Sequence, residues 1–300
     1  MKRHRTPPKH RKKIFISSGT VGHFEAIVKE LNTFTMYSLS QFKILAFALA
    51  AVIIVVATAP FAEANHDWDG YHWARTQNPF TVSLGDNVSS GWDAALRGAS
   101  SDWSQSSVLN TAVVSGKSSR SCRPTAGRVE VCNGKYGANG WLGIASIWTN
   151  GEHITAGTVK LNDTYFSQKQ YNTAAWKNLV MCQEVGHAFG LDHQDENFAN
   201  GNLGTCMDYT NSPESNQHPN EHDYDMLEDI YSHTDSSTTV GKSSRQAASA
   251  EINDIKDLGR EVRRSVRSSV YERDLGGDQK VVTHVFWIDP QEDGHEEHDH

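Results

Sequence analysis

One eleven-residue segment constrains this chain more than any other. Residues 183–193 read Gln-Glu-Val-Gly-His-Ala-Phe-Gly-Leu-Asp-His and close an apolar stretch with helical spacing. In a helix, Gln183 and His187 share one face because they lie four residues apart. Gly190 can take the positive φ that ends a helix, so we expect the helix to break there. The plain alternative is an amphipathic core helix with a capped end.

This segment resembles the zinc-binding signature of the metzincin metalloproteases, H-E-x-x-H-x-x-G-x-x-H, with glutamine in place of the first histidine. The resemblance implies that Gln183, His187 and His193 hold a zinc ion, with the chain turning back at Gly190. It also implies that Glu184 acts as general base on the metal-bound water and then donates a proton to the leaving amine.

A second motif lies in residues 204–209, Gly-Thr-Cys-Met-Asp-Tyr. Metzincins carry a tight turn with a methionine beneath the metal, and astacins and serralysins have a tyrosine two residues later. Met207 and Tyr209 match these positions, which implies that Tyr209 supports the oxyanion. Core filling and aromatic packing are the plain alternatives. A looser match at residues 218–231 resembles the last helix of matrixins, and the whole resemblance, closest to the matrixin-like branch, covers about residues 75–233.

The glutamine at the first ligand position leaves several hypotheses open. An amide oxygen is a weaker and harder donor to zinc than an imidazole nitrogen, so metal affinity should fall. The charge of the ligand set is unchanged, so a bound water should still be acidified. The first hypothesis is a working peptidase, and the second is a non-catalytic protein that uses the scaffold to bind peptides or an envelope partner. A metal-dependent hydrolase of a non-peptide bond is the third.

An apolar run at residues 44–62 indicates export. Lys43 precedes it and small residues follow, which predicts a signal peptide over residues 1–64 with cleavage after Ala64 and Met36 as an alternative start. An uncleaved membrane anchor is the alternative. The basic residues at the start are typical of the cytoplasmic side of such a segment and do not indicate nucleic-acid binding. We expect an extracellular or periplasmic protein without stable membrane association.

Export favours disulfides for the four cysteines of the chain. Three pairings are possible, and proximity in the sequence favours Cys122 with Cys132 and Cys182 with Cys206. The second bridge would clamp the predicted ligand helix to the methionine turn. Cys182 is disfavoured as a metal ligand because it lies five residues before His187, which points it away from the ligand face.

The apolar pattern predicts an α+β fold. The chain has 300 residues, 37% hydrophobic and 21% charged, which is room for one moderate domain with tails. Helical spacing recurs over residues 92–103. By resemblance, the fold is a twisted mixed sheet with this helix behind it, the active-site helix crossing beneath, and a final helix after the methionine turn. Strand patterns lie at residues 80–84, 108–114, 127–131, 141–148 and 154–161.

The composition divides the chain beyond the predicted catalytic domain, residues 65–235. Residues 236–264 are poor in apolar side chains and predict a disordered linker. Residues 265–290 predict a β-hairpin around a glycine turn, which is marginal alone and should pack on the domain or on a partner. Residues 291–300 form an acidic, histidine-rich tail.

Substrate and calcium sites follow as further expectations. In metzincins the strand above the cleft binds an extended substrate as an added strand, and residues 140–147 are the candidate edge. Asp192, Asp195, Glu196 and Asp208 are candidate structural calcium ligands, although an acidic face is more often merely solvated. The predicted function is a secreted zinc-dependent endopeptidase that acts on polypeptides.

Overall fold

The computed structural model of the protein describes residues 66–117, 121–242, 252 and 254–289. The predicted signal peptide and the predicted tail at 291–300 lie outside these residues. Within the described ranges, the structure shows no helix that is both long and apolar enough to cross a bilayer.

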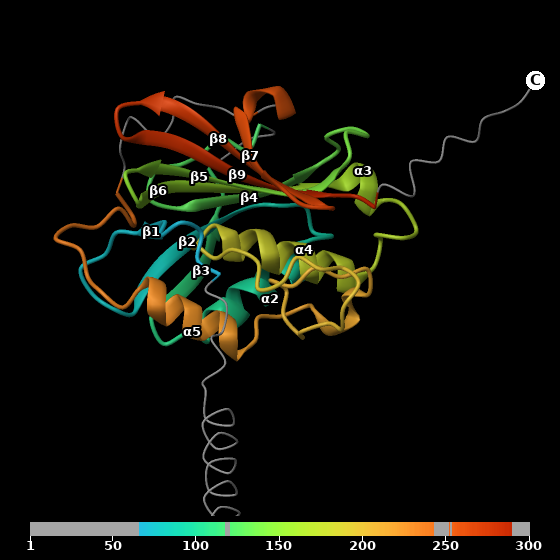
Figure 1. Cartoon of the computed structure of the whole chain (residues 1–300), viewed down its shortest axis with the longest axis horizontal. Helices are drawn as coiled ribbons and strands as arrows, with labels where there is room; N and C mark the ends of the chain where they lie inside the picture. Colours follow the sequence, from blue (N-terminus) through green and yellow to red (C-terminus); the bar gives the residue numbers. More distant parts are fainter. Residues whose placement is uncertain (1–65, 118–120, 243–251, 253, 290–300) are drawn as a thin grey trace, which may run out of the picture. The chain divides into compact units, whose positions relative to one another are not determined.

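A large mixed sheet carries the fold (Figure 1). Its strands are β1 (His72–Trp73), β2 (Phe80–Asn87), β3 (Leu109–Ser115), β4 (Val129–Gly134), β5 (Trp141–Asn150), β6 (His153–Asn162), β7 (Arg260–Arg264), β8 (Ser268–Gly276) and β9 (Gln279–Trp287). The order across the sheet is β3-β2-β4-β6-β5-β9-β8-β7, with β1 on β6. The pairs from β3 to β6 are parallel, whereas those from β6 to β7 are antiparallel. The expected α+β class with a mixed sheet is therefore confirmed.

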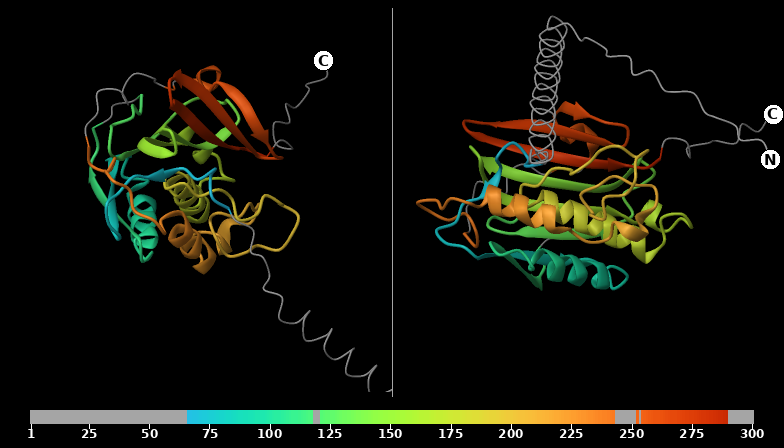
Figure 2. Two further views of the ribbon diagram at one scale, coloured as in Figure 1. Left: turned by 60° about the vertical axis from the view of Figure 1, so that its left-hand side comes forward. Right: turned by 60° about the horizontal axis from the view of Figure 1, so that its bottom comes forward.

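Three helices cover one face of this sheet (Figures 1 and 2). They are α2 (Asp93–Trp103), α4 (Ala174–His187) and α5 (Glu221–Ile230). A short helix, α3 (Asp163–Phe166), follows β6, and short 3-10 turns lie at Pro213–Ser215 and Ile255–Asp257. Helix α4 lies beneath β5 and β6, with α2 beside it. Helix α5 begins with a capping box between Asn220 and Asp223, and Tyr224 donates to the Asp102 carbonyl oxygen at the end of α2.

Helix α4 ends where the glycine signal predicts a break. The Thr173 side chain caps its start by accepting from the Trp176 amide. Its last residue is His187, and Gly190 follows with φ +95°. A Cβ at Gly190 would lie 1.9 Å from the Tyr71 carbonyl oxygen, so both the backbone angle and the space require glycine.

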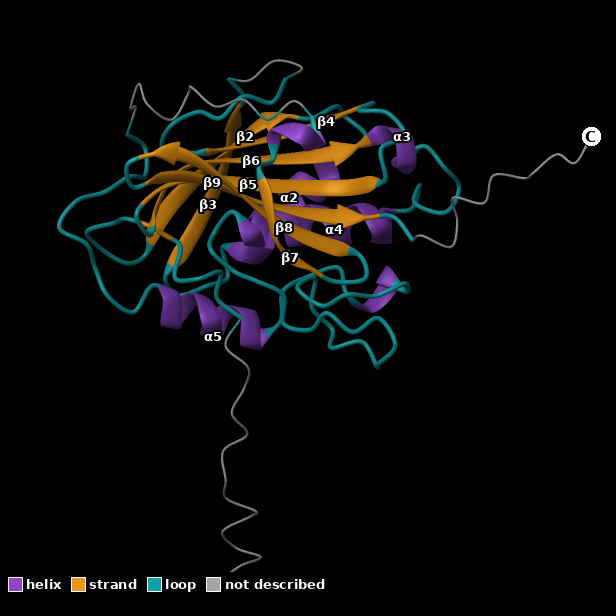
Figure 3. Ribbon diagram, turned by 45° about the horizontal axis from the view of Figure 1, so that its top comes forward, coloured by secondary structure: helices purple, strands orange, loops and turns teal. Residues whose placement is uncertain are grey.

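The C-terminal strands close the sheet over α4 and differ from two expectations. The expected free edge at residues 140–147 is wrong, because β9 pairs with β5 from Trp141 to Asn150 (Figure 3). The expected disordered linker over 236–264 does not hold for residues 254–264, which contain a 3-10 turn and β7. All five residues of β7 are exposed, so backbone pairing with β8 holds this strand without an apolar pattern.

Strand β9 is buried on both faces, which explains why it does not remain a free hairpin. Val282 and Phe286 join the main core between the sheet and the helices. Val281 and Val285 alternate with them and join a second core on the opposite face, together with Leu258. The hairpin expected within residues 265–290 is observed as β8 and β9, and it packs on the sheet.

Candidate metal centre

The two predicted histidine ligands converge below the sheet. His187 ends α4 and His193 follows the Gly190 turn, and their Nε2 atoms lie 3.1 Å apart. His187 Nδ1 donates to the Leu191 carbonyl oxygen at 2.8 Å. His193 Nδ1 faces the Glu196 carboxylate at 3.3 Å. Because carbonyl and carboxylate oxygens accept, each Nδ1 carries the proton, and two Nε2 lone pairs then face each other. A cation between them would remove this repulsion.

A third histidine, His284 of β9, completes the cluster. His187, His193 and His284 each offer a ligand atom within 4.8 Å of the others. The ring centroid of His284 is 4.1 Å from that of His187 and 4.7 Å from that of His193. All three side chains are buried, with at most 6% exposed. Three imidazoles suit a borderline metal such as zinc, and the cluster can hold a metal ion.

His284 also contacts the two residues predicted to act in catalysis. Its Nδ1 lies 3.2 Å from Glu184 Oε2, and its Nε2 lies 3.0 Å from the Tyr209 hydroxyl. Glu184 and Tyr209 are 0% and 1% exposed. The predicted general base and the predicted oxyanion donor therefore contact the two ring nitrogens of one side chain of the C-terminal hairpin.

The amide of Gln183 lies buried without a partner. Gln183 is 0% exposed, and neither its Oε1 nor its Nε2 has a hydrogen-bond partner in the described structure. It precedes His187 by one helical turn on α4, so both lie on the same face. A buried amide without a partner costs free energy. A metal ion at the histidine cluster would give its oxygen a positive partner, so these residues fit a metal.

Burial dominates the electrostatics of the centre. It lowers the pKa of His187 to about 3, with His193 adding to the effect. It lowers the pKa of His284 well below its ordinary value and raises the pKa of Glu184 well above its own. It also raises the pKa of Tyr209. The imidazoles of His187 and His284 are thus neutral near pH 7, which is the form that binds metals.

A disulfide and a methionine support α4 beside the centre. Cys182 and Cys206 are bridged, and so are Cys122 and Cys132, which confirms the predicted pairing. Two disulfides indicate an oxidising compartment outside the cytoplasm. Met207 packs under α4, since a Cβ at Gly186 would lie 2.8 Å from its sulfur.

The candidate calcium ligands are engaged by protein donors. Asp192 accepts from Arg263 Nη2 of β7 at 2.6 Å. Asp208 Oδ2 accepts from the Leu203 amide and from Asn216 Nδ2, each at 2.8 Å. Glu196 faces His193, as described above. These carboxylates act as partners of nearby groups, and calcium binding stays a prediction.

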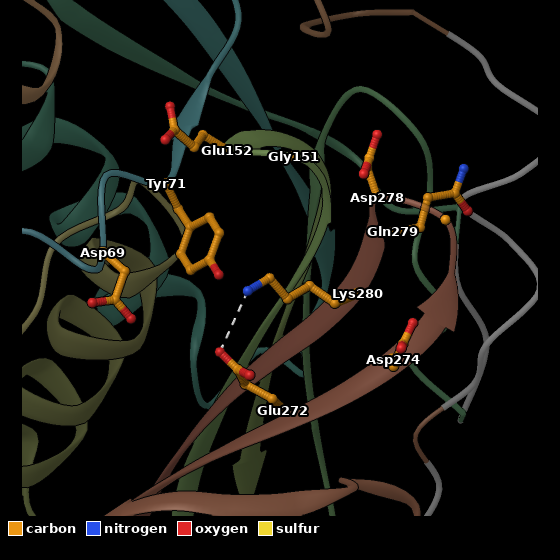
Figure 4. Close-up of a pocket in the computed structure, with 10 residues that line it drawn as sticks. Asp69, Tyr71, Gly151, Glu152, Glu272, Asp274, Asp278, Gln279 and Lys280 are labelled. Carbon is orange, nitrogen blue, oxygen red and sulfur yellow. Dashed lines mark hydrogen bonds and ion pairs between the residues drawn. The ribbon is translucent and has the colours of Figure 1, made fainter.

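A cavity of about 640 Å³ opens at the far end of the hairpin rather than at the centre (Figure 4). It is acidic, and Lys280 Nζ lies 3.4 Å from Glu272 Oε1 within it. None of its lining residues is a predicted site residue. Its lining residues are Asp69, Tyr71, Gly151, Glu152, Glu272, Asp274, Gly277, Asp278, Gln279 and Lys280.

Comparisons with known proteins do not assign this chain to a family. No model of a known protein family matches the chain, and no curated protein matches it. The candidate metal centre therefore rests on the residues and contacts of this structure alone.

His284 is the member of the centre that the sequence pattern around α4 does not contain. It lies between Val282 and Phe286 at two-residue spacing in a strand-like run, which places it on the same apolar face as these two residues. A histidine on such a face needs a polar partner. A histidine on an apolar strand face therefore indicates a buried polar contact, but the sequence does not identify the partner in that contact.

Proposed function

We propose that the protein is a secreted zinc-dependent endopeptidase that its own C-terminal hairpin holds closed. The observation that carries the proposal is the convergence of His187, His193 and His284 beside Glu184 and Tyr209. Zinc, when bound there, would polarise a peptide carbonyl and acidify a water molecule. The oxidising compartment indicated by the disulfides is consistent with export.

Three side chains of the protein would then have separate roles in the reaction. Glu184 takes a proton from the attacking water and returns it to the leaving amine, a task that suits a carboxylate whose pKa is raised by burial. The Tyr209 hydroxyl donates to the oxygen on which negative charge develops. Gln183 supplies an amide oxygen as third ligand once His284 withdraws.

The closed state follows from the position of β9. Strand β9 runs antiparallel along β5, where an extended substrate would otherwise add as a strand. Its His284 side chain occupies the space next to Glu184 that an attacking water would need. Hydrolysis therefore requires β9 to leave β5.

A permanent, non-catalytic metal centre is the second candidate function. The observation that favours it is the depth of β9, because Val282 and Phe286 are 1% and 0% exposed. A strand that completes the core on both faces is costly to remove. In this case the metal centre would be structural, and any peptide binding would use another surface.

The test loosens β9 without touching a predicted ligand. Thr283 pairs with Ser146 of β5, and their hydroxyl oxygens lie 2.9 Å apart. Thr283→Pro removes an amide donor from a central strand, which should detach β9. Val262→Pro is the matched control, because Val262 lies in the exposed edge strand β7. Zinc-dependent cleavage of casein should rise at least tenfold in Thr283→Pro only.

The second candidate predicts a different result in the same assay. A Thr283→Pro protein that still unfolds cooperatively, retains stoichiometric zinc and cleaves neither casein nor unstructured peptides contradicts the endopeptidase. Loss of zinc together with loss of cooperative unfolding in Thr283→Pro would show that β9 is a permanent part of the fold.

A further inference from the structure

A second histidine cluster lies away from the centre described above, where three separate segments meet. His72 belongs to β1, His153 begins β6, and His233 and Asp235 follow α5. His72, His233 and Asp235 each offer a ligand atom within 4.8 Å of the others. The His72 side chain is buried, whereas those of His153 and His233 are 42% and 51% exposed.

The buried His72 and the partly buried Asp235 are oriented by their other polar atoms. His72 Nδ1 donates to the Gly70 carbonyl oxygen at 2.7 Å, so Nε2 of the neutral ring carries a lone pair. Asp235 Oδ2 accepts from the backbone amide of Arg75 at 3.1 Å and from its Nη1 at 3.0 Å. Oδ1 is left to face the imidazoles. Such outer hydrogen bonds are what fix the ligands of protein metal sites.

The spacing of the inward atoms matches a tetrahedral ion. Zinc bonds of about 2.0–2.2 Å in a tetrahedron place the ligand atoms about 3.3–3.6 Å from one another. His72 Nε2 lies 3.3 Å from His233 Nε2. Asp235 Oδ1 lies 3.7 Å from His72 Nε2, 3.8 Å from His233 Nε2 and 3.2 Å from His153 Nε2.

The lone pairs of this cluster also require a positive charge between them. His72 Nε2 and Asp235 Oδ1 face each other at 3.7 Å, and neither atom has a hydrogen to donate when the imidazole is neutral. Either a proton on His72 or a metal ion resolves the contact. A metal ion would also use His233, whose Nε2 belongs to the same group of mutually close ligand atoms. His153 Nε2 approaches Asp235 Oδ1 but lies outside that group.

We propose that His72, His233 and Asp235 form a second, structural zinc site, and that the half-exposed His153 turns toward the bound ion as its fourth ligand. A set of three imidazoles and one carboxylate leaves no open position, as in other structural zinc sites. The ion would fasten β1 and the turn before β6 to the chain that leaves α5. This site does not depend on the proposed peptidase activity.

The test counts zinc in the purified full chain after equilibration with zinc and removal of the free ion. His233→Ala should bind one zinc ion fewer per chain than the wild type. His153→Ala should keep the ion but bind it at least tenfold more weakly. His218→Ala is the matched control, because His218 is an exposed histidine paired with Asp102 outside both clusters. His218→Ala should retain the wild-type content.

A second measurement separates this site from the central one. His187→Ala should lose the central ion but still gain thermal stability from added zinc, and the His187→Ala/His233→Ala double variant should not. An unchanged zinc content in His233→Ala together with an unchanged zinc affinity in His153→Ala would overturn the proposal and assign the cluster to a protonated His72. A His187→Ala protein that gains no thermal stability from added zinc would also overturn it, and would leave the proposal of the central site untouched.

Discussion

The two histidine clusters contain the same ligand type but differ in what surrounds them. In the central cluster, His187, His193 and His284 are buried, and His284 contacts Glu184 and Tyr209, which can move a proton or stabilise charge. In the peripheral cluster of His72, His153, His233 and Asp235, the neighbouring groups are a backbone carbonyl and an arginine. The groups that surround the ligands, rather than the ligands themselves, therefore distinguish a candidate catalytic metal site from a candidate structural one.

The largest expected effect is on hydrolysis, and it should appear at the central cluster alone. In the Thr283→Pro background, Glu184→Gln should lower casein cleavage by about 100-fold or more, because general-base catalysis is lost. Zinc content should not change. Glu196→Gln is the matched control, since this carboxylate also faces a predicted ligand, His193. Equal loss in both variants would mean that Glu184 has no special role.

The next effect is acid sensitivity of the metal-free protein. Burial holds the pKa of His187 at about 3 and that of His284 well below 6.5. The unfolded chain takes up protons near pH 6.5 that the folded chain cannot, so stability is full above that pH and falls as the pH drops toward 3.

Urea unfolding between pH 7.5 and 4 measures this loss. His284→Leu should reduce the dependence of stability on pH by about one proton per molecule. His233→Leu is the comparison variant, because His233 is half-exposed and lies outside the central cluster. An equal effect of both substitutions would remove the distinction between the clusters.

A smaller effect is expected from the two disulfides, which should differ in their contributions to the free energy of unfolding and to zinc affinity. Cys182–Cys206 has a sequence separation of 24, and Cys122–Cys132 one of 10. Replacing each pair by alanine should cost about 3.5 and about 2.8 kcal/mol of unfolding free energy, from loop closure in the unfolded chain. Only loss of Cys182–Cys206 should weaken central zinc binding, because it holds α4 to the methionine turn. Chemical unfolding and zinc titration measure both, and equal weakening of zinc by either pair would argue against this clamp.

The smallest expected effect concerns the ion pair between β7 and the loop before His193. Arg263→Ala removes the partner of Asp192 and should cost less than about 1 kcal/mol, since Arg263 is 44% exposed. It should raise basal peptidase activity only a few-fold by loosening the hairpin. Arg264→Ala is the control within the same strand, because Arg264 pairs with the nearby Glu261. A larger increase from Arg264→Ala would contradict an anchoring role for Arg263.

The sequence predicts the α4 side of the central site because its geometry is local. A four-residue spacing and one glycine determine where Gln183, His187 and His193 lie, and short separations favour the two disulfides. His284 and the closure of β5 depend on a strand register that local periodicity does not specify. The sequence does not predict strand β7, because its exposed side chains lack an apolar pattern. It does not predict the peripheral cluster either, because that cluster joins three segments that lie far apart in the sequence.

The most direct test is an anomalous X-ray difference map of zinc-loaded crystals of the protein. A peak within about 2.1 Å of a ring nitrogen of each of His187, His193 and His284 is the predicted result. A map with no peak among these three imidazoles would contradict the central claim that the C-terminal hairpin completes a metal centre.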